Sequence, residues 1–310
     1  MKRSIPLFLC LLMVFKTAFA GEKQKIIFDC DLGDDIDDAF ALALVLASPE
    51  FEVLGVVMDY GYTEKRAQIA CRMLYETGLE HIPVVVGRQT HQNYSPQFHW
   101  GEGFKKVNPI KQSAAYFIIE NLRKYPNEVI LFTVGPVPNM ADVIKKDPDA
   151  LKLAKHIYSM FGSFYMGYDG GPVPDAEWNV HADIESAKLF AASGAPITYA
   201  GLDITTFVKL EEDLRLKLLM RQSPLTNALC GLYSLWEQKT PTLYDIVAVG
   251  MVLWPNLFTT RPAHVKVIEG GYTVIDESKE PNCDVGITIN KGEFLNRIIR
   301  RYLHQNLERQ

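Results

Sequence analysis

Residues 26–39 of this 310-residue chain read IIFDCDLGDDIDDA, and they decide the fold. The apolar residues of 26–31 predict a buried strand, and the Gly/Asp segment after it predicts a loop. The apolar residues that follow predict a helix over about 38–47. A strand, a short loop and a helix in this order form the repeating unit of a parallel sheet.

The same alternation continues over most of the chain. Further strands are expected at 51–58, 83–87, 128–134, 156–160 and 196–200, and further helices at 63–77, 111–124, from 138 and at 183–192. Beyond these, residues 211–253 are helical in pattern, 263–289 return as short strands around a Gly270-Gly271 turn, and a basic amphipathic helix covers 291–307. The sequence therefore predicts an α/β fold: an open, mostly parallel, Rossmann-like sheet with helices on both faces and a small antiparallel addition. No repeat or linker divides residues 21–310, so we expect a single domain.

The N-terminus has the pattern of an export signal. It begins with basic residues, continues with the mainly apolar run 5–15 and ends with Ala-Phe-Ala at 18–20, which predicts cleavage before Gly21. The alternative is a membrane anchor, but the apolar run is too short to span a bilayer. We therefore expect residues 1–20 to be removed from an exported protein, periplasmic or secreted, with no stable membrane anchor.

Charge and cysteine content limit the classes of partner and site. Removing the three basic residues of the signal changes the net charge from −5 to −8, and an acidic chain without a basic stripe argues against nucleic acid as a partner. Four cysteines remain, with no spacing typical of a zinc site: Cys30, Cys71, Cys230 and Cys283. Free thiols are the simplest expectation, although export leaves a disulfide open.

The densest chemical pattern is a run of aspartates after the first strand. Six of the ten residues from 29 to 38 are aspartate. Ligands of open parallel sheets bind at the carboxyl ends of strands, so this loop opens into the expected cleft. Clustered carboxylates repel one another unless a cation neutralises them, and hard oxygen ligands suit Ca²⁺ or Mg²⁺ rather than zinc. Helix-capping and solvated surface acids are the alternative explanation.

Two long segments, 88–109 and 162–180, exceed what the fold requires and have the composition of a substrate lid. Glu177-Trp178-Asn179 offers a carboxylate, an aromatic plane and an amide together, and Tyr244-Asp245 precedes an apolar helical run. Alone, Asp245 is more typical of a helix cap than of a metal ligand. Four aromatic side chains are candidates to stack on an aromatic base or, equally, to pack the loops: Trp100, Tyr165, Trp178 and Tyr244.

Five motifs in the same order resemble the nucleoside hydrolases, the inosine–uridine-preferring N-ribosyl hydrolases, over nearly the whole mature chain. They are Asp29-Cys30-Asp31-Leu32-Gly33 with Asp37-Asp38-Ala39, the strand end 131–139, Glu177-Trp178-Asn179, Gly201-Leu202-Asp203-Ile204-Thr205, and Asp245. The first of them contains two more residues than the family's Asp-x-Asp-Pro-Gly-x-Asp-Asp-Ala. The resemblance implies hydrolysis of a ribonucleoside, or a related N-riboside, to ribose and free base. It also implies a homodimer or homotetramer.

The resemblance also implies roles for individual residues. The ligands of Ca²⁺ would be Asp31, Asp38, Asp245 and the backbone carbonyl of Val134. Asp31 would further take a proton from the metal-bound water that attacks the sugar. The ribose hydroxyls would be bound by Asp37, Glu177 and Asn179. Apart from the resemblance, the aromatic side chains of Trp100 and Trp178 are our predicted substrate contacts. Carboxylates around the sugar stabilise the oxocarbenium-like transition state of N-glycosidic cleavage.

The departures from the family pattern concern the leaving-group side. Tyr244 stands where many members have the histidine that helps to protonate a departing purine, so Tyr244 is our candidate proton donor, though a weaker acid than imidazolium. His99 and His181 are alternative donors. Leu32 replaces a proline, and Tyr62 and Gly171 replace asparagines.

Two other hypotheses remain. Asp29-x-Asp31 after a strand also resembles the nucleophile motif of haloacid-dehalogenase-like phosphatases, but that hypothesis leaves Asp37, Asp38 and Asp245 unexplained. The missing histidine and asparagines suggest instead an exported binder that keeps the metal and sugar site without turnover. The preferred leaving group and the oligomeric state are not determined by the sequence.

Overall fold

A computed structural model describes residues 22–309 of the chain. The predicted export signal, residues 1–20, and its cleavage before Gly21 lie outside the described residues and stay predictions, as does the predicted oligomer. Within residues 22–309, no helix is both long enough and apolar enough to cross a bilayer. The four cysteines of this part of the chain are free thiols.

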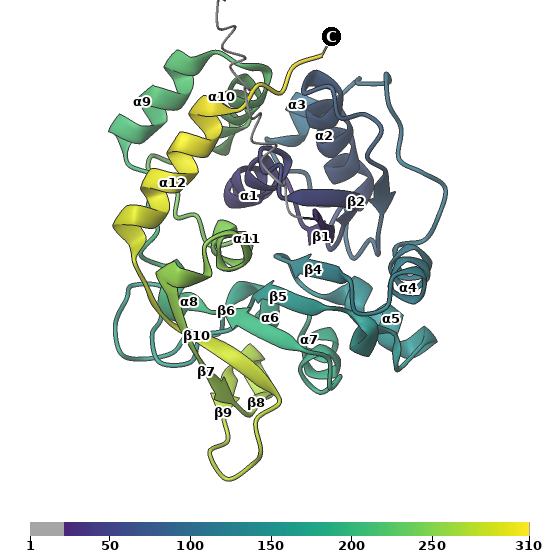
Figure 1. Ribbon diagram of the computed structural model, residues 1–310, viewed down its shortest axis with the longest axis vertical. Coiled ribbons are helices and arrows are strands. Elements are labelled where there is room, and N and C mark those ends of the chain that lie inside the picture. The colour runs from purple at the N-terminus through teal and green to yellow at the C-terminus, as the bar shows by residue number, and fades with distance from the viewer. Residues whose placement is uncertain (1–21, 310) are drawn as a thin grey trace, which may run out of the picture.

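The centre of the molecule is an eight-stranded sheet with the order β3-β2-β1-β4-β5-β6-β10-β7 (Figure 1). Its strands are β1 (Gln24–Cys30), β2 (Phe51–Met58), β3 (Val84–Val86), β4 (Val129–Thr133), β5 (His156–Met160), β6 (Ile197–Ala200), β7 (Phe258–Ala263) and β10 (Cys283–Ile289). All neighbours pair in parallel except β10 and β7. The predicted α/β fold with a mostly parallel sheet is confirmed. Because β1 lies between β2 and β4, the aspartate loop leaves the sheet near its middle.

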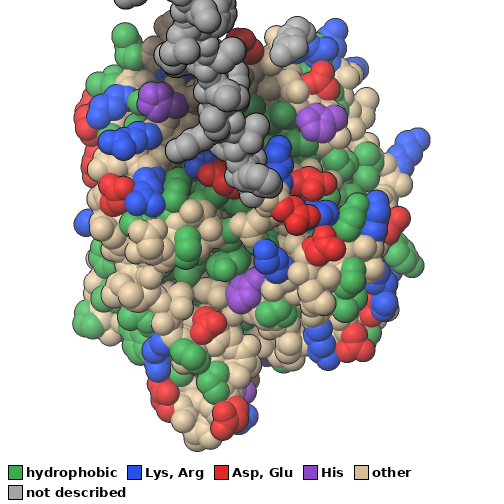
Figure 2. All heavy atoms as spheres, viewed as in Figure 1, with side chains coloured by type: hydrophobic (Ala, Val, Ile, Leu, Met, Phe, Trp, Pro, Cys, Tyr) green, Lys and Arg blue, Asp and Glu red, His purple; other side chains and the backbone are tan. Residues whose placement is uncertain are grey.

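Helices cover both faces of this sheet, and each face has its own apolar core. One face carries α1 (Asp37–Leu46), α2 (Thr63–Glu76), α10 (Pro224–Trp236), α11 (Ile246–Leu253) and α12 (Lys291–His304), with α9 (Glu212–Arg221) outside them. The other face carries α4 (Ala114–Lys124), α5 (Pro138–Lys146) and α7 (Ile184–Ala191). Short helices α3 (Phe98–Gly101), α6 (Trp178–His181) and α8 (Leu202–Thr205) lie in the connections. On the surface that Figure 2 shows, basic side chains are scattered among acidic ones rather than gathered in a stripe.

The C-terminal third differs in detail from the prediction. The helical stretch 211–253 is divided because Gln222 and Glu237 adopt left-handed conformations, with φ of 53° and 65°, that end α9 and α10. The predicted antiparallel addition is confirmed as the hairpin β8 (Val265–Val267) and β9 (Thr273–Ile275) around Gly270-Gly271. Strand β7, however, begins at Phe258, earlier than predicted. It is an edge strand with mixed exposure and contains Pro262, so its sequence lacks a regular strand pattern.

Candidate functional site

A cleft of about 440 Å³ opens at the carboxyl ends of β1, β4 and β5. The residues that line it are Asp31, Asp34, Asp35, Asp37, Asp38, Val134, Met160, Tyr168, Glu177, Trp178, Asn179, Trp236, Gln238, Tyr244 and Asp245. This is where an open parallel sheet is expected to bind its ligand. The cleft therefore joins the aspartate loop, the Glu-Trp-Asn motif and the Tyr-Asp pair, which lie far apart in the sequence.

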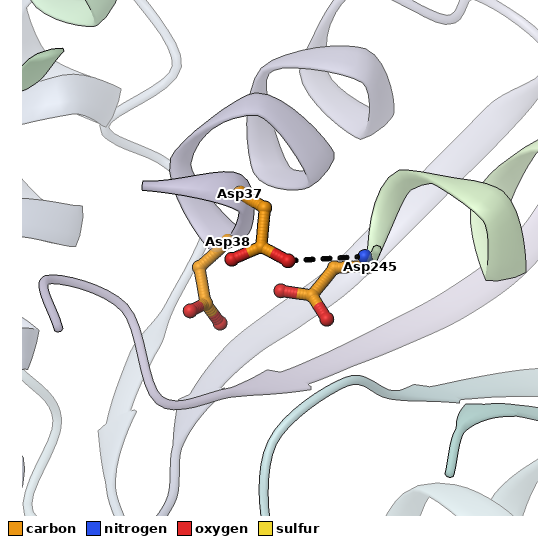
Figure 3. Close-up of side chains that lie close together, drawn as sticks. All are labelled: Asp37, Asp38 and Asp245. Carbon is orange, nitrogen blue, oxygen red and sulfur yellow. Dashed lines mark hydrogen bonds between the residues drawn. The ribbon is translucent and has the colours of Figure 1, made fainter. Parts of the chain in front are cut away.

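Three aspartates meet at the floor of the cleft. Each of Asp37, Asp38 and Asp245 offers a carboxylate oxygen, and these oxygens lie within 4.8 Å of one another (Figure 3). Asp37 and Asp38 begin α1, where the helix dipole favours negative charge. One oxygen of Asp37 accepts the backbone N–H groups of Tyr244 (3.1 Å) and Asp245 (3.3 Å), and so fixes the start of α11 beside α1.

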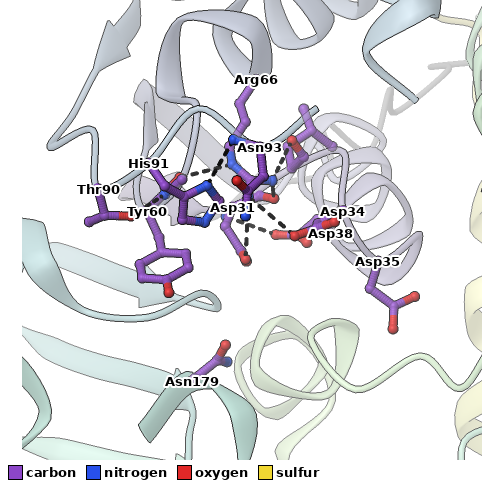
Figure 4. Close-up of polar contacts among 12 residues, drawn as sticks. Asp31, Asp34, Asp35, Asp38, Tyr60, Arg66, Thr90, His91, Asn93 and Asn179 are labelled. Carbon is purple, nitrogen blue, oxygen red and sulfur yellow. Dashed lines mark hydrogen bonds and ion pairs between the residues drawn. The ribbon is translucent and has the colours of Figure 1, made fainter. Parts of the chain in front are cut away.

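Asp31 and Val134, the other two predicted metal ligands, line the same cleft. The Asp31 backbone N–H donates to Oδ1 of Asp38 at 3.1 Å, which ties the start of the loop to its end. The Val134 carbonyl accepts the side-chain amide of Asn179 at 2.9 Å. Asp31 and Asn179 both line the cleft and come from different parts of the fold, as Figure 4 shows. All four predicted ligands are thus brought to one place.

These carboxyl groups lie in an environment that opposes their charge. Burial raises the pKa of Asp31 to about 6, although Arg66 partly offsets this. Burial and then neighbouring aspartates raise the pKa values of Asp38 and Asp245 well above the usual range. A divalent cation would offset both the cost of burying charged carboxylates and the repulsion between them, since it supplies positive charge to the buried oxygens. The donor set therefore fits a hard cation such as Ca²⁺.

Glu177 and Asn179, the predicted ribose-binding pair, form the opposite wall. Glu177 caps α6: its Oε1 accepts the Asn179 N–H at 2.8 Å, and its Oε2 accepts the Gly162 N–H at 2.9 Å. Burial raises the pKa of Glu177 to about 7. Asp203, from the predicted motif 201–205, accepts the backbone N–H groups of residues 164 and 165 at 3.0 and 2.7 Å. These two hydrogen bonds fix the start of the long segment 162–180, which carries Glu177 and Asn179.

Aromatic side chains form the outer part of the cleft. Trp178 is half exposed, and Tyr168 packs edge-on against Tyr244 with ring centroids 5.9 Å apart. The Tyr168 hydroxyl oxygen accepts the Trp178 N–H at 2.8 Å. No sequence pattern singles out Tyr168, although it lies in the predicted lid, or Trp236, which ends α10.

Some predicted candidates lie elsewhere. Trp100 does not line the cleft, because the guanidinium of Arg72 packs over its ring at 4.3 Å on the outside of α2. Tyr165 is also outside the cleft, hydrogen-bonded to Arg261. The aromatic candidates that the structure brings to the cleft are therefore Trp178 and Tyr244.

Neither alternative histidine reaches the cleft. His99 is exposed and contacts the hydroxyl of Tyr94 (3.1 Å) and the carboxylate of Glu102 (3.2 Å). The His181 ring contacts the Gly270 carbonyl at 3.0 Å. In the described part of the chain, no histidine lines the cleft, which leaves Tyr244 as the predicted donor nearest to the metal ligands.

Arg66 is a buried cation that was not among the residues predicted from sequence. Its guanidinium donates to the carbonyls of Asp31 and, at 3.1 Å, Leu32, and it lies 3.6 Å from the carboxylate of Asp34 (Figure 4). It therefore fixes the backbone of the aspartate loop and offsets part of its charge. In the sequence, Arg66 directly follows Glu64 and Lys65 and so resembles one more surface charge. The one signal of its burial is its position on the apolar stripe of α2, in line with Ala70 and Met73.

Asp29, the first aspartate of the motif, supports the site from beneath. It is buried, does not line the cleft and accepts the side-chain amide of Asn139 at 2.8 Å. A phosphatase of the haloacid-dehalogenase type would need this carboxylate as an exposed nucleophile, so the geometry contradicts that hypothesis. Asp59, which directly follows the end of β2, is fully buried as well.

Gly135 allows this packing, and its replacement by alanine should be destabilising. A Cβ atom there would lie 2.6 Å from carboxylate oxygens of both Asp31 and Asp59. We expect Gly135→Ala to reduce the free energy of unfolding by about 1–3 kcal/mol, measured by urea denaturation. The control is Gly292→Ala in α12, where nothing lies within 4 Å of the added methyl group. Equal stability of the two variants would contradict the proposed crowding.

Comparison with known proteins agrees with this geometry. The family model described as inosine-uridine preferring nucleoside hydrolase matches residues 26–296. Uridine nucleosidase 1 of Arabidopsis thaliana is 31% identical, over 83% of each chain, and the pyrimidine-specific ribonucleoside hydrolase RihA of Citrobacter koseri is 27% identical over 89% of this chain and 97% of its own. The solved purine-preferring ribonucleoside hydrolase from Gardnerella vaginalis superimposes with a TM-score of 0.78 at 24% identity, covering 90% and 98% of the two chains. The chain belongs to the inosine-uridine preferring nucleoside hydrolase family.

Proposed function

We propose that this enzyme is a Ca²⁺-dependent nucleosidase that cleaves the N-glycosidic bond of a ribonucleoside, or a related N-riboside, to ribose and free base. Family membership supports ribonucleoside hydrolysis in general. The observation that carries the finer proposal is the meeting of Asp31, Asp38 and Asp245 with Glu177 and Asn179 around one cleft.

Four groups would hold the ion: the carboxylates of Asp31, Asp38 and Asp245 and the carbonyl of Val134. Buried carboxylate and carbonyl oxygens are the ligands that Ca²⁺ prefers, and flexible coordination suits a site drawn from separate loops. When bound, the ion supplies positive charge that acidifies water and neutralises the carboxylates.

The remaining residues divide the reaction between them. Asp31 accepts the proton of the water that attacks the anomeric carbon. Asp37, Glu177 and Asn179 bind and orient the ribose hydroxyls, and the negative charge of Asp37 and Glu177 stabilises the oxocarbenium-like sugar. Trp178 and Tyr244 contact the base, and the Tyr244 hydroxyl donates a hydrogen bond to it as it leaves.

Release of reducing sugar by the purified protein tests the proposal. We expect ribose release from uridine or inosine in the presence of Ca²⁺ and a loss of at least about a hundredfold in rate after chelation, because an aspartate cluster alone does not acidify water. Restoring Ca²⁺ should restore the rate. Hydrolysis that persists unchanged in the chelator would contradict the metal-dependent mechanism, and absence of hydrolysis for every riboside would contradict the proposed activity.

A further inference from the structure

The lining of the cleft is strongly acidic. Seven carboxyl side chains line it, whereas no lysine, arginine or histidine does so among residues 22–309. A bound divalent ion and the adjacent Arg66 guanidinium together bring three positive charges, so carboxyl groups remain in excess. Such a cleft favours a substrate that carries positive charge over a neutral one.

Part of this excess of carboxyl groups comes from the segment 34–36. That segment belongs to the loop that is two residues longer than the family motif. The buried side-chain amide of Gln97 donates to the carbonyls of Asp34 and Asp35, both at 3.0 Å, so the longer loop is fixed against the protein. Asp34 is paired with Arg66, but Asp35 has no basic side chain within ion-pair distance in the part of the chain that the structure describes. Figure 4 shows the Asp35 side chain pointing away from Arg66.

Asp35 shares the outer cleft with aromatic rings. Trp236 lies beside it, and Tyr168, Trp178 and Tyr244 line the same opening. Aromatic faces combined with a carboxylate form the arrangement that recognises a cation with spread-out charge. The outer cleft thus provides both parts of a site for a flat, positively charged ring.

The chemistry of the leaving group points to the same substrates. A neutral purine or pyrimidine departs with the bonding electron pair as an anion, and it therefore needs a proton from an acid such as histidine. No histidine lines the cleft within residues 22–309, and the Tyr244 hydroxyl, which does line it, is a weaker acid than imidazolium. A base that is already cationic at the glycosidic nitrogen needs no proton, because it departs as a neutral molecule.

We propose that this enzyme selects N-ribosides whose base carries a fixed positive charge, such as pyridinium ribosides, and that Asp35 recognises that charge. This inference rests on the proposed N-riboside hydrolysis. In the reaction, the water oxygen bonds to the anomeric carbon while the carbon–nitrogen bond breaks and its electron pair passes to the ring nitrogen. The ring becomes neutral, the water proton passes to Asp31, and the transient positive charge on the sugar stays among the carboxylates.

Two pyridinium ribosides that differ in net charge provide the test. Nicotinamide riboside carries a net charge of plus one, whereas nicotinic acid riboside has the same ring with a carboxylate that cancels it. We expect kcat/KM to favour the first, and we expect Asp35→Asn to reduce that preference about fivefold, mainly through KM. Asp213→Asn, on the exposed surface of α9, is the matched control and should leave the preference unchanged. Uridine is measured beside both.

The outcomes separate the two proposals. A preference for nicotinamide riboside that falls in Asp35→Asn but not in Asp213→Asn supports the inference. Rapid uridine hydrolysis with equal or no cleavage of the two pyridinium ribosides overturns it while the proposed function stands. A preference unaffected by Asp35→Asn overturns the role of Asp35. If no riboside of any charge is cleaved, both proposals are wrong.

Discussion

Replacing Asp31 by asparagine is expected to lower kcat for riboside hydrolysis by about a hundredfold to ten-thousandfold, the usual contribution of a general base. Asparagine keeps the shape of the side chain and one oxygen, but it cannot accept the proton of the attacking water. KM should change much less, since the ribose contacts come from Glu177, Asn179 and Asp37. Steady-state kinetics on the preferred riboside measures both quantities.

As a control for this variant, calorimetry measures its binding of Ca²⁺ and of substrate. Retained binding with lost turnover supports Asp31 as the base, whereas unchanged kcat would show that another group accepts the proton. If the wild-type protein itself binds ribosides and Ca²⁺ without cleaving them, the hypothesis of a non-catalytic binder replaces the nucleosidase.

Without calcium, the protein should lose stability as the pH rises from about 4 to about 7. The pKa values of Asp31 (about 6) and Glu177 (about 7) are raised by burial above the values near 4 that such groups have when unfolded. The folded state therefore binds their protons more tightly than the unfolded state does. This contribution to stability is complete below about pH 4 and is lost as the pH rises through 6 to 7. Urea denaturation at several pH values in a chelator measures it.

Calcium should reverse this trend. The ion binds ionised carboxylates, so its affinity rises over the same pH range. At one fixed calcium concentration, the gain in the free energy of unfolding should therefore be larger at pH 8 than at pH 5, and it is about 2.7 kcal/mol where that concentration is a hundred times the Kd. Gly292→Ala, which is remote from the cleft, should show the same calcium response as the wild type. Equal protection by calcium at both pH values would contradict the assignment of the carboxylates as its ligands.

The sheet was predictable from sequence because its inner strands are covered on both faces. Strand β4 is almost continuously apolar, and β1 contains the apolar run 26–28; each is followed by a loop and a helix. Edge strand β7 lacks this pattern, since one of its sides is open to solvent and it contains a proline. The division of 211–253 into helices depends on left-handed residues that are neither glycine nor asparagine, which local propensity does not reveal.

The site residues were predictable where the order of motifs along the chain identifies them. Asp31, Asp38 and Asp245 follow from motif order, and the structure brings them to one cleft. Arg66 and Trp100 were not predictable, since their surroundings depend on tertiary packing rather than on neighbours in sequence. Arg66 turns inward to carbonyl groups of another loop, and Trp100 packs against a helix instead of the ligand.

The distribution of these aspartates along the chain also has a consequence for biogenesis. A nascent polypeptide of 200 residues already contains β1 to β6, yet Asp245 has still to be synthesised. The last helix then closes the assembly, as Tyr302 of α12 donates its hydroxyl to the Phe40 carbonyl of α1 at 2.6 Å. At about 5–20 residues per second, this happens several seconds after the sheet can begin to form. Capture of the proposed ion is therefore expected to be a late event, and prematurely terminated products would lack Asp245, one of its proposed ligands.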